Sequence, residues 1–133
     1  MNLESLINSL SSDEPPPDLS VHLRSLWYDA KGDWERSHTI IQEINDRNAA
    51  WIHAYLHRKE GDIGNADYWY HRAGKSRPSL TLQEEWKEIV KAIVGSSELG
   101  ASLESLVDGL CQSLYETFSF VVLLCRLWRL DSC

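Results

Sequence analysis

His53 and His57 lie four residues apart, and Glu60 follows three residues after the second histidine. On a helix this spacing projects the three side chains from one face, where two imidazoles and a carboxylate could hold a metal ion. His71 could supply a further ligand from a neighbouring helix. Ala54 stands where the glutamate of an HExxH site would follow the first histidine, which excludes zinc-protease chemistry. Both histidines could instead pack their rings between helices and hydrogen-bond there.

Apolar residues recur at three- and four-residue steps along most of the chain, which predicts an all-α fold. Residues 1–18 are expected to form a short helix followed by a proline-rich spacer, because three consecutive prolines favour extended backbone. The predicted helices cover residues 1–10, 19–31, 34–44, 48–60, 64–73 and 82–94.

Two Gly-Asp pairs separate consecutive predicted helices, at Gly32 and Gly61, which lie 29 residues apart. Glycine suits the backbone that ends a helix, and Asp33 can cap the helix that follows. Thr81 and Glu84 fit a capping box in front of the 82–94 helix. From residue 19 onward the sequence therefore predicts two tandem helix-turn-helix units and a fifth helix.

Small and aromatic residues and a proline recur in the second unit at Ala54, Ala66, Tyr70, Ala73 and Pro78. In these residues the unit resembles a tetratricopeptide repeat, in which small residues allow two helices to approach closely and a proline closes the repeat. The first unit departs from this pattern and has Ser37 at the small position. The resemblance covers about residues 19–78 and, together with the fifth helix, implies a helical domain of this type over residues 19–95.

The strings WYDAKGDW, HAYLHRKEGD and YWYHRAG are also similar to a group of small uncharacterised bacterial proteins, a likeness that implies no function. The repeat alignment places His53 and His57 where the family has residues that face the next helix. We therefore favour the packing interpretation of the two histidines, and we expect no metal and no other cofactor.

The other side of the same helix carries Trp51, Tyr55, Arg58 and Lys59. In tetratricopeptide arrays this side lines a concave groove that binds acidic peptides, so the resemblance implies a short binding groove here. Arg58 can give two N–H groups to a carboxylate, and the two rings supply flat apolar contact. The alternative is an ordinary solvated helix face.

Residues 96–133 are predicted to form a long amphipathic helical extension, because large apolar residues recur on one stripe. Its apolar run is too short for a transmembrane span and is followed at once by arginines. The stripe is expected to cap the hairpin stack, with pairing to a second copy or a disordered or lipid-surface segment as alternatives. The stripe contains Leu99, Leu103, Leu106, Leu110, Leu114, Phe118, Val121, Cys125 and Trp128.

The chain has 133 residues with 43% apolar residues, enough for one domain with a core, and a formal net charge of −7. That charge disfavours a nucleic-acid partner, which needs a basic surface. The N-terminus lacks an export signal, and the three cysteines form no metal or disulfide pattern, so we expect a cytoplasmic protein.

Taken together, these features predict a small adaptor that binds a protein or an acidic peptide through a short groove. The alternative is a small metal- or ligand-binding protein or enzyme that uses His53, His57, Glu60 and His71. No Ser-His-Asp, Cys-His or phosphate-loop pattern is present in the sequence, which disfavours an enzyme.

Overall fold

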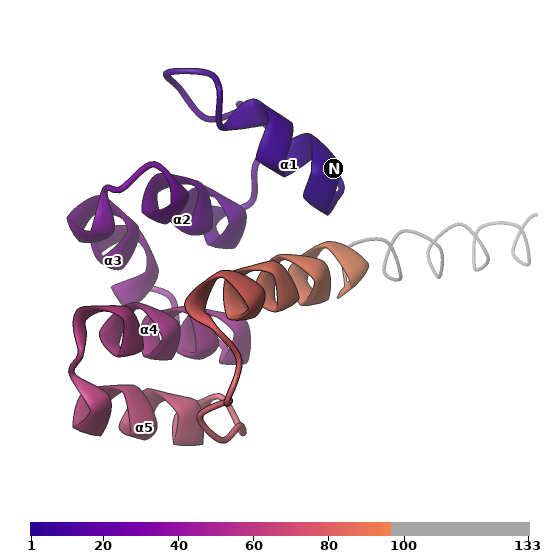
Figure 1. Cartoon of the computed structure of the whole chain (residues 1–133). Helices are drawn as coiled ribbons and strands as arrows, with labels where there is room; N and C mark the ends of the chain where they lie inside the picture. Colours follow the sequence, from indigo (N-terminus) through magenta and orange to yellow (C-terminus); the bar gives the residue numbers. More distant parts are fainter. Residues whose placement is uncertain (97–133) are drawn as a thin grey trace, which may run out of the picture. The chain divides into compact units, whose positions relative to one another are not determined.

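The computed structural model describes residues 1–96, and this part of the chain is all helical (Figure 1). A further helix covers residues 82–96. The predicted C-terminal extension, with its proposed capping or homo-oligomer role, lies outside the described residues apart from residue 96. The first five helices are α1 (Leu3–Ser9), α2 (Val21–Ala30), α3 (Trp34–Gln42), α4 (Arg47–Glu60) and α5 (Ile63–Arg72).

Both Gly-Asp pairs form the turns that the sequence predicts. Gly32 and Gly61 have φ angles of +86° and +91°, in the left-handed region that favours glycine. Asp33 and Asp62 then cap α3 and α5, because their side chains accept hydrogen bonds from backbone N–H groups of the first turn. Helix α2 thus folds back along α3, and α4 along α5.

Small residues line the seam inside each pair of helices. Ser25 on α2 and Ser37 on α3 are both fully buried, and their Oγ atoms lie 2.9 Å apart. Ala54 on α4 packs with Ala66 and Tyr70 on α5. The packing role predicted for Ala54, Ala66 and Tyr70 is therefore confirmed, although the relationship to tetratricopeptide repeats stays a prediction.

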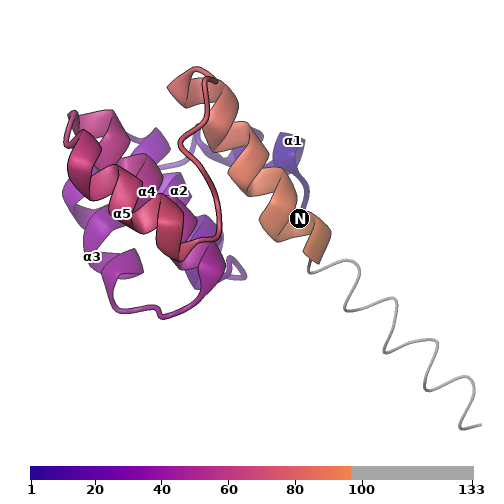
Figure 2. The same cartoon turned by 90° about the horizontal axis from the view of Figure 1, so that it is seen from below.

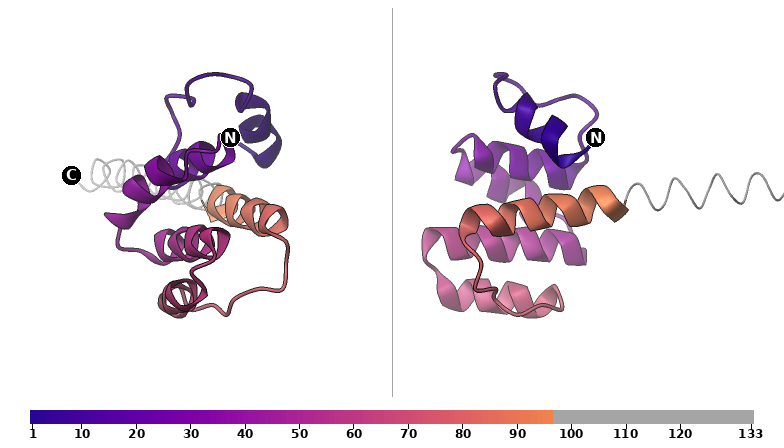
Figure 3. Two further views of the ribbon diagram at one scale, coloured as in Figure 1. Left: turned by 60° about the vertical axis from the view of Figure 1, so that its left-hand side comes forward. Right: turned by 45° about the vertical axis from the view of Figure 1, so that its right-hand side comes forward.

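The 82–96 helix packs on α4 and α2, and its capping box is confirmed because Thr81 and Glu84 exchange hydrogen bonds. Trp86 is 7% exposed, and its indole N–H donates to the carbonyl oxygen of Leu26 on α2 at 3.1 Å. Figures 2 and 3 show this helix on one flank of α4 and α5 on another. Residues 1–95 form one compact unit that includes α1.

Helix α1 belongs to this unit because Leu6 is fully buried in the core and Trp27 on α2 donates its indole N–H to Ser9 Oγ at 3.1 Å. Lys31 donates to the carbonyl oxygens of Leu10 and Ser12, which holds the segment after α1 against the end of α2. Among residues 1–96, the helices are all too short or too polar to cross a membrane.

Candidate functional site

The predicted groove residues of α4 face the 82–96 helix, and two of them hold its Glu85. This carboxylate is 0% exposed. Arg58 donates to Glu85 Oε2 at 2.6 Å and also to the carbonyl oxygen of Leu80. Trp51 donates its indole N–H to Glu85 Oε1 at 3.3 Å, and Tyr70 on α5 donates its hydroxyl to the same oxygen at 2.5 Å. Arg58, which is expected to bind a partner's carboxylate, thus binds one from its own chain, and Trp51 donates to the same carboxylate.

Tyr55 and Lys59, the other two predicted groove residues, meet at Asp29 on α2. The Tyr55 hydroxyl donates to Asp29 Oδ2 at 2.9 Å, and Lys59 Nζ donates to Asp29 Oδ1 at 2.8 Å. Asp29 is 2% exposed, whereas the Lys59 side chain is 36% exposed. Burial, and after it the Asp29 carboxylate, raises the pKa of Tyr55, which keeps the phenol as a donor.

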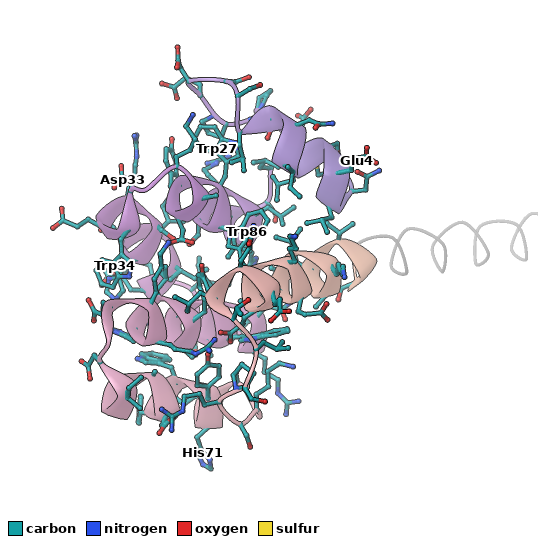
Figure 4. The ribbon with its side chains drawn as sticks, viewed as in Figure 1. Glu4, Trp27, Asp33, Trp34, His71 and Trp86 are labelled. Carbon is teal, nitrogen blue, oxygen red and sulfur yellow. The ribbon has the colours of Figure 1, made fainter. Side chains whose placement is uncertain are left out.

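A hollow of about 600 Å³ opens beside Tyr55 and Lys59, between α1, the end of α2, α4 and the 82–96 helix. Its surface is largely apolar, with a few charged groups. Figure 4 labels Trp86, which forms part of this surface where the 82–96 helix meets α2. The lining residues are Ile7, Leu10, Asp29, Ala30, Gly32, Tyr55, Lys59, Leu82, Gln83, Trp86 and Lys87.

A cluster of histidine side chains lies on the other side of α4, where His38 of α3 meets His53 and His57. The Nε2 atoms of His38 and His53 are 2.9 Å apart. The two α4 rings stack at a centroid distance of 4.8 Å, and His57 Nδ1 lies 2.8 Å from Glu60 Oε1. His53 and His57 are 6% and 7% exposed, so the prediction that they pack in the interior is confirmed.

The third histidine of this cluster is not the one that the sequence suggested. His71 is exposed on α5, and Figure 4 shows it at the outer edge of the molecule, away from the labelled Trp34 beside the cluster. His38 takes its place because α3 packs against α4 and brings its second turn to the histidine face. The sequence signal for His38 is its position four residues after Trp34, on the same helix face.

Two tryptophans form walls around the histidines. Trp34 stacks on His38 with a centroid distance of 4.8 Å and an interplanar angle of 11°. Trp69 on α5 stacks on His53 at 3.9 Å and 19°. The Trp34 indole N–H also donates to the carbonyl oxygen of Leu56 at 2.9 Å, which fixes this ring against α4.

Two imidazoles of this cluster, those of His38 and His53, favour their neutral forms. Burial, followed by the neighbouring His38 and His57, lowers the pKa of His53 to about 4. Burial and then His57 also lower the pKa of His38, against a smaller opposing effect of Glu60. A neutral imidazole keeps one lone pair, which can accept a hydrogen bond or bind a metal ion.

Comparison with known proteins gives no relative: family models, curated proteins and solved structures were all searched, and none matches this chain. The hollow and the histidine cluster are therefore the two features of the described residues from which a function can be inferred.

Proposed function

We propose that this protein is a small adaptor that binds an acidic segment of a partner protein in the hollow beside Tyr55 and Lys59. The observation that carries the proposal is a largely apolar hollow of about 600 Å³ with lysines along its edge. Its volume lies within the range of about 300 to 1,000 Å³ that ligand sites span. It accommodates one or two anchoring side chains, so we expect weak, reversible binding.

Charge supports an acidic partner. The charged groups that line the hollow are Asp29, Lys59 and Lys87. The Asp29 carboxylate is buried and already accepts hydrogen bonds from Tyr55 and Lys59, so the hollow keeps an excess positive charge on a chain of net charge −7. Because the Lys59 side chain is partly exposed, its remaining N–H groups can donate charge-assisted hydrogen bonds to a carboxylate of the partner.

Apolar side chains on several sides of the hollow support the binding of an apolar side chain of the partner there. Ile7 on α1 is 40% exposed, and it lines the same hollow as Leu82 and Trp86. Burying such a patch under a leucine or aromatic side chain of a partner removes apolar surface from water. The occupant that fits is thus an acidic segment with an apolar anchor.

The proposal retains half of the predicted groove. Tyr55 and Lys59 line the hollow, whereas Arg58 and Trp51 hold Glu85 and so support the wall that the 82–96 helix forms. The binding surface of this proposal therefore lies nearer the α1 end of the unit than a groove centred on Arg58 would.

Photo-crosslinking tests this proposal directly. A photoreactive benzoylphenylalanine at Gln83, which is exposed and lines the hollow, should capture a partner in cells, and mass spectrometry should identify the attached segment as acidic. The substitutions Lys59→Glu and Lys87→Glu should abolish this capture. Lys91→Glu, which affects only an exposed pair on the same helix, should leave it unchanged. Attachment to a neutral or basic segment, or capture insensitive to Lys87→Glu, would contradict the proposal.

A further inference from the structure

We propose that His38, His53 and His57 bind one divalent transition-metal ion, with zinc as the ion that best fits three imidazoles. This site lies on the α3 and α5 side of α4 and is independent of the hollow. One ligand atom from each histidine lies within 4.8 Å of the other two. Two histidines four residues apart on one helix, joined by a third from a neighbouring helix, are a recurrent way to hold zinc.

Two of the three ligand atoms already lie near the spacing that a zinc ion requires. At Zn–N distances of about 2.0 to 2.1 Å, tetrahedral ligand nitrogens lie about 3.4 Å apart. The Nε2 atoms of His38 and His53 are 2.9 Å apart, so a small separation of the two rings makes room for an ion between them. The cluster therefore already brings these nitrogens to about the separation that a shared ion needs.

Glu60 gives His57 the orientation of a metal ligand. His57 Nδ1 lies 2.8 Å from Glu60 Oε1, and this contact makes Nδ1 the protonated nitrogen and leaves the Nε2 lone pair available. A histidine that donates its second N–H to a carboxylate is the usual arrangement around protein-bound zinc, because the carboxylate fixes the ring and raises its basicity.

The walls of the cluster restrict the rings further. His38 stacks on Trp34, and His53 lies between its α4 neighbour and Trp69. Because these rings hold the imidazoles before any ion arrives, little side-chain entropy remains to be lost on binding. His38 is partly exposed, which gives an ion a route into the cluster from the α3 side.

The ligand set also indicates which ions would bind. Three imidazole nitrogens suit zinc, copper or nickel, whereas calcium and magnesium require oxygen ligands. Three protein ligands leave a fourth tetrahedral position for water or for a group from outside the chain. The proposed site is therefore open to an exogenous ligand.

Metal titration of protein purified without a histidine tag tests the proposal. Isothermal titration with zinc chloride should show one ion per chain, and cobalt(II) should give the visible absorption bands of a tetrahedral nitrogen site. The melting temperature should rise with added zinc, because an ion that binds only the folded state stabilises it. Absence of stoichiometric binding by both ions would overturn the proposal.

Histidine variants locate the site. His38→Gln should weaken zinc binding more than Glu60→Gln, for which we expect a loss of about 10- to 100-fold because it removes only the orienting carboxylate. His71→Gln is the matched control, since this histidine is exposed on α5, and it should bind zinc like the parent protein. Zinc affinity unchanged in His38→Gln, or lowered equally in His71→Gln, would overturn the proposal. Glu60 is exposed, so its variant remains informative if His38→Gln fails to fold.

Discussion

The Glu85 carboxylate gives the sharpest test of how this fold is held together. It is 0% exposed and accepts hydrogen bonds from Arg58, Tyr70 and Trp51. Glu85→Met keeps a side chain of similar length but removes the acceptor, so Arg58 and Tyr70 lose their partner. Removing one member of a buried ion pair costs about 3 to 5 kcal/mol. Because the Arg58 side chain stays 17% exposed, we expect the lower end, about 3 kcal/mol.

Urea denaturation followed by tryptophan fluorescence measures this loss, and a thermal melt should show a fall of at least about 12 °C. Arg58→Met and the double variant complete a thermodynamic cycle. The double variant should be more stable, by at least about 1 kcal/mol, than the sum of the two single-variant losses predicts. Glu88→Met, on the same helix but exposed, should change stability by less than about 0.5 kcal/mol. A cost under about 1 kcal/mol for Glu85→Met, or strict additivity with Arg58→Met, would refute this reasoning.

Three further predictions concern the histidine cluster and the second turn. In the folded state the pKa of His53 is about 4, so its imidazole stays neutral down to that pH. In the unfolded chain the same imidazole takes up a proton near pH 6.5. The free energy of unfolding of the metal-free protein should therefore fall by about 2 to 3 kcal/mol as the pH falls from 6.5 to 4. His38 and His57 face this ring and contribute to its lowered pKa. In urea titrations with a chelator, His53→Gln should lose less stability over this pH range, and an equal loss in that variant would contradict the assignment. Gly61→Ala should destabilise the fold by about 1 to 2 kcal/mol in the same assay, because φ is +91° there, and an unchanged urea midpoint would count against this. Gly64→Ala, in a helix with open space around the position, should instead stabilise by up to about 1 kcal/mol, and a lower midpoint would show that this expectation fails.

The features that the sequence predicts well are local ones. Gly32 and Gly61 end helices because of their own backbone freedom, and the caps at Asp33 and Thr81 use hydrogen bonds to groups three residues away. Such features depend on a few neighbouring residues, so the helices and turns up to residue 96 could be predicted closely. The burial of His53 could also be predicted, from its place in the pattern of the second hairpin.

The features that the sequence predicts poorly depend on residues that are far apart in the chain. His38 meets His53 only because α3 packs on α4, and spacing along one helix could not choose between His38 and His71. Arg58 reaches Glu85 across 27 positions of sequence. The sequence nevertheless indicates that Glu85 is buried, because it lies three residues after Leu82 and four before Ile89, on the apolar face of its helix. A charge in that place requires a buried partner.

The buried Glu85 carboxylate also determines the axial register of the 82–96 helix. A slide by one helical turn would bring Ile89 or Thr81 opposite Arg58 and Tyr70 in place of Glu85. Those donors would then be desolvated without an acceptor, although in residues 1–96 every buried side-chain nitrogen and oxygen has a partner. Apolar contacts alone would tolerate several alignments of such a helix, and the ion pair selects one.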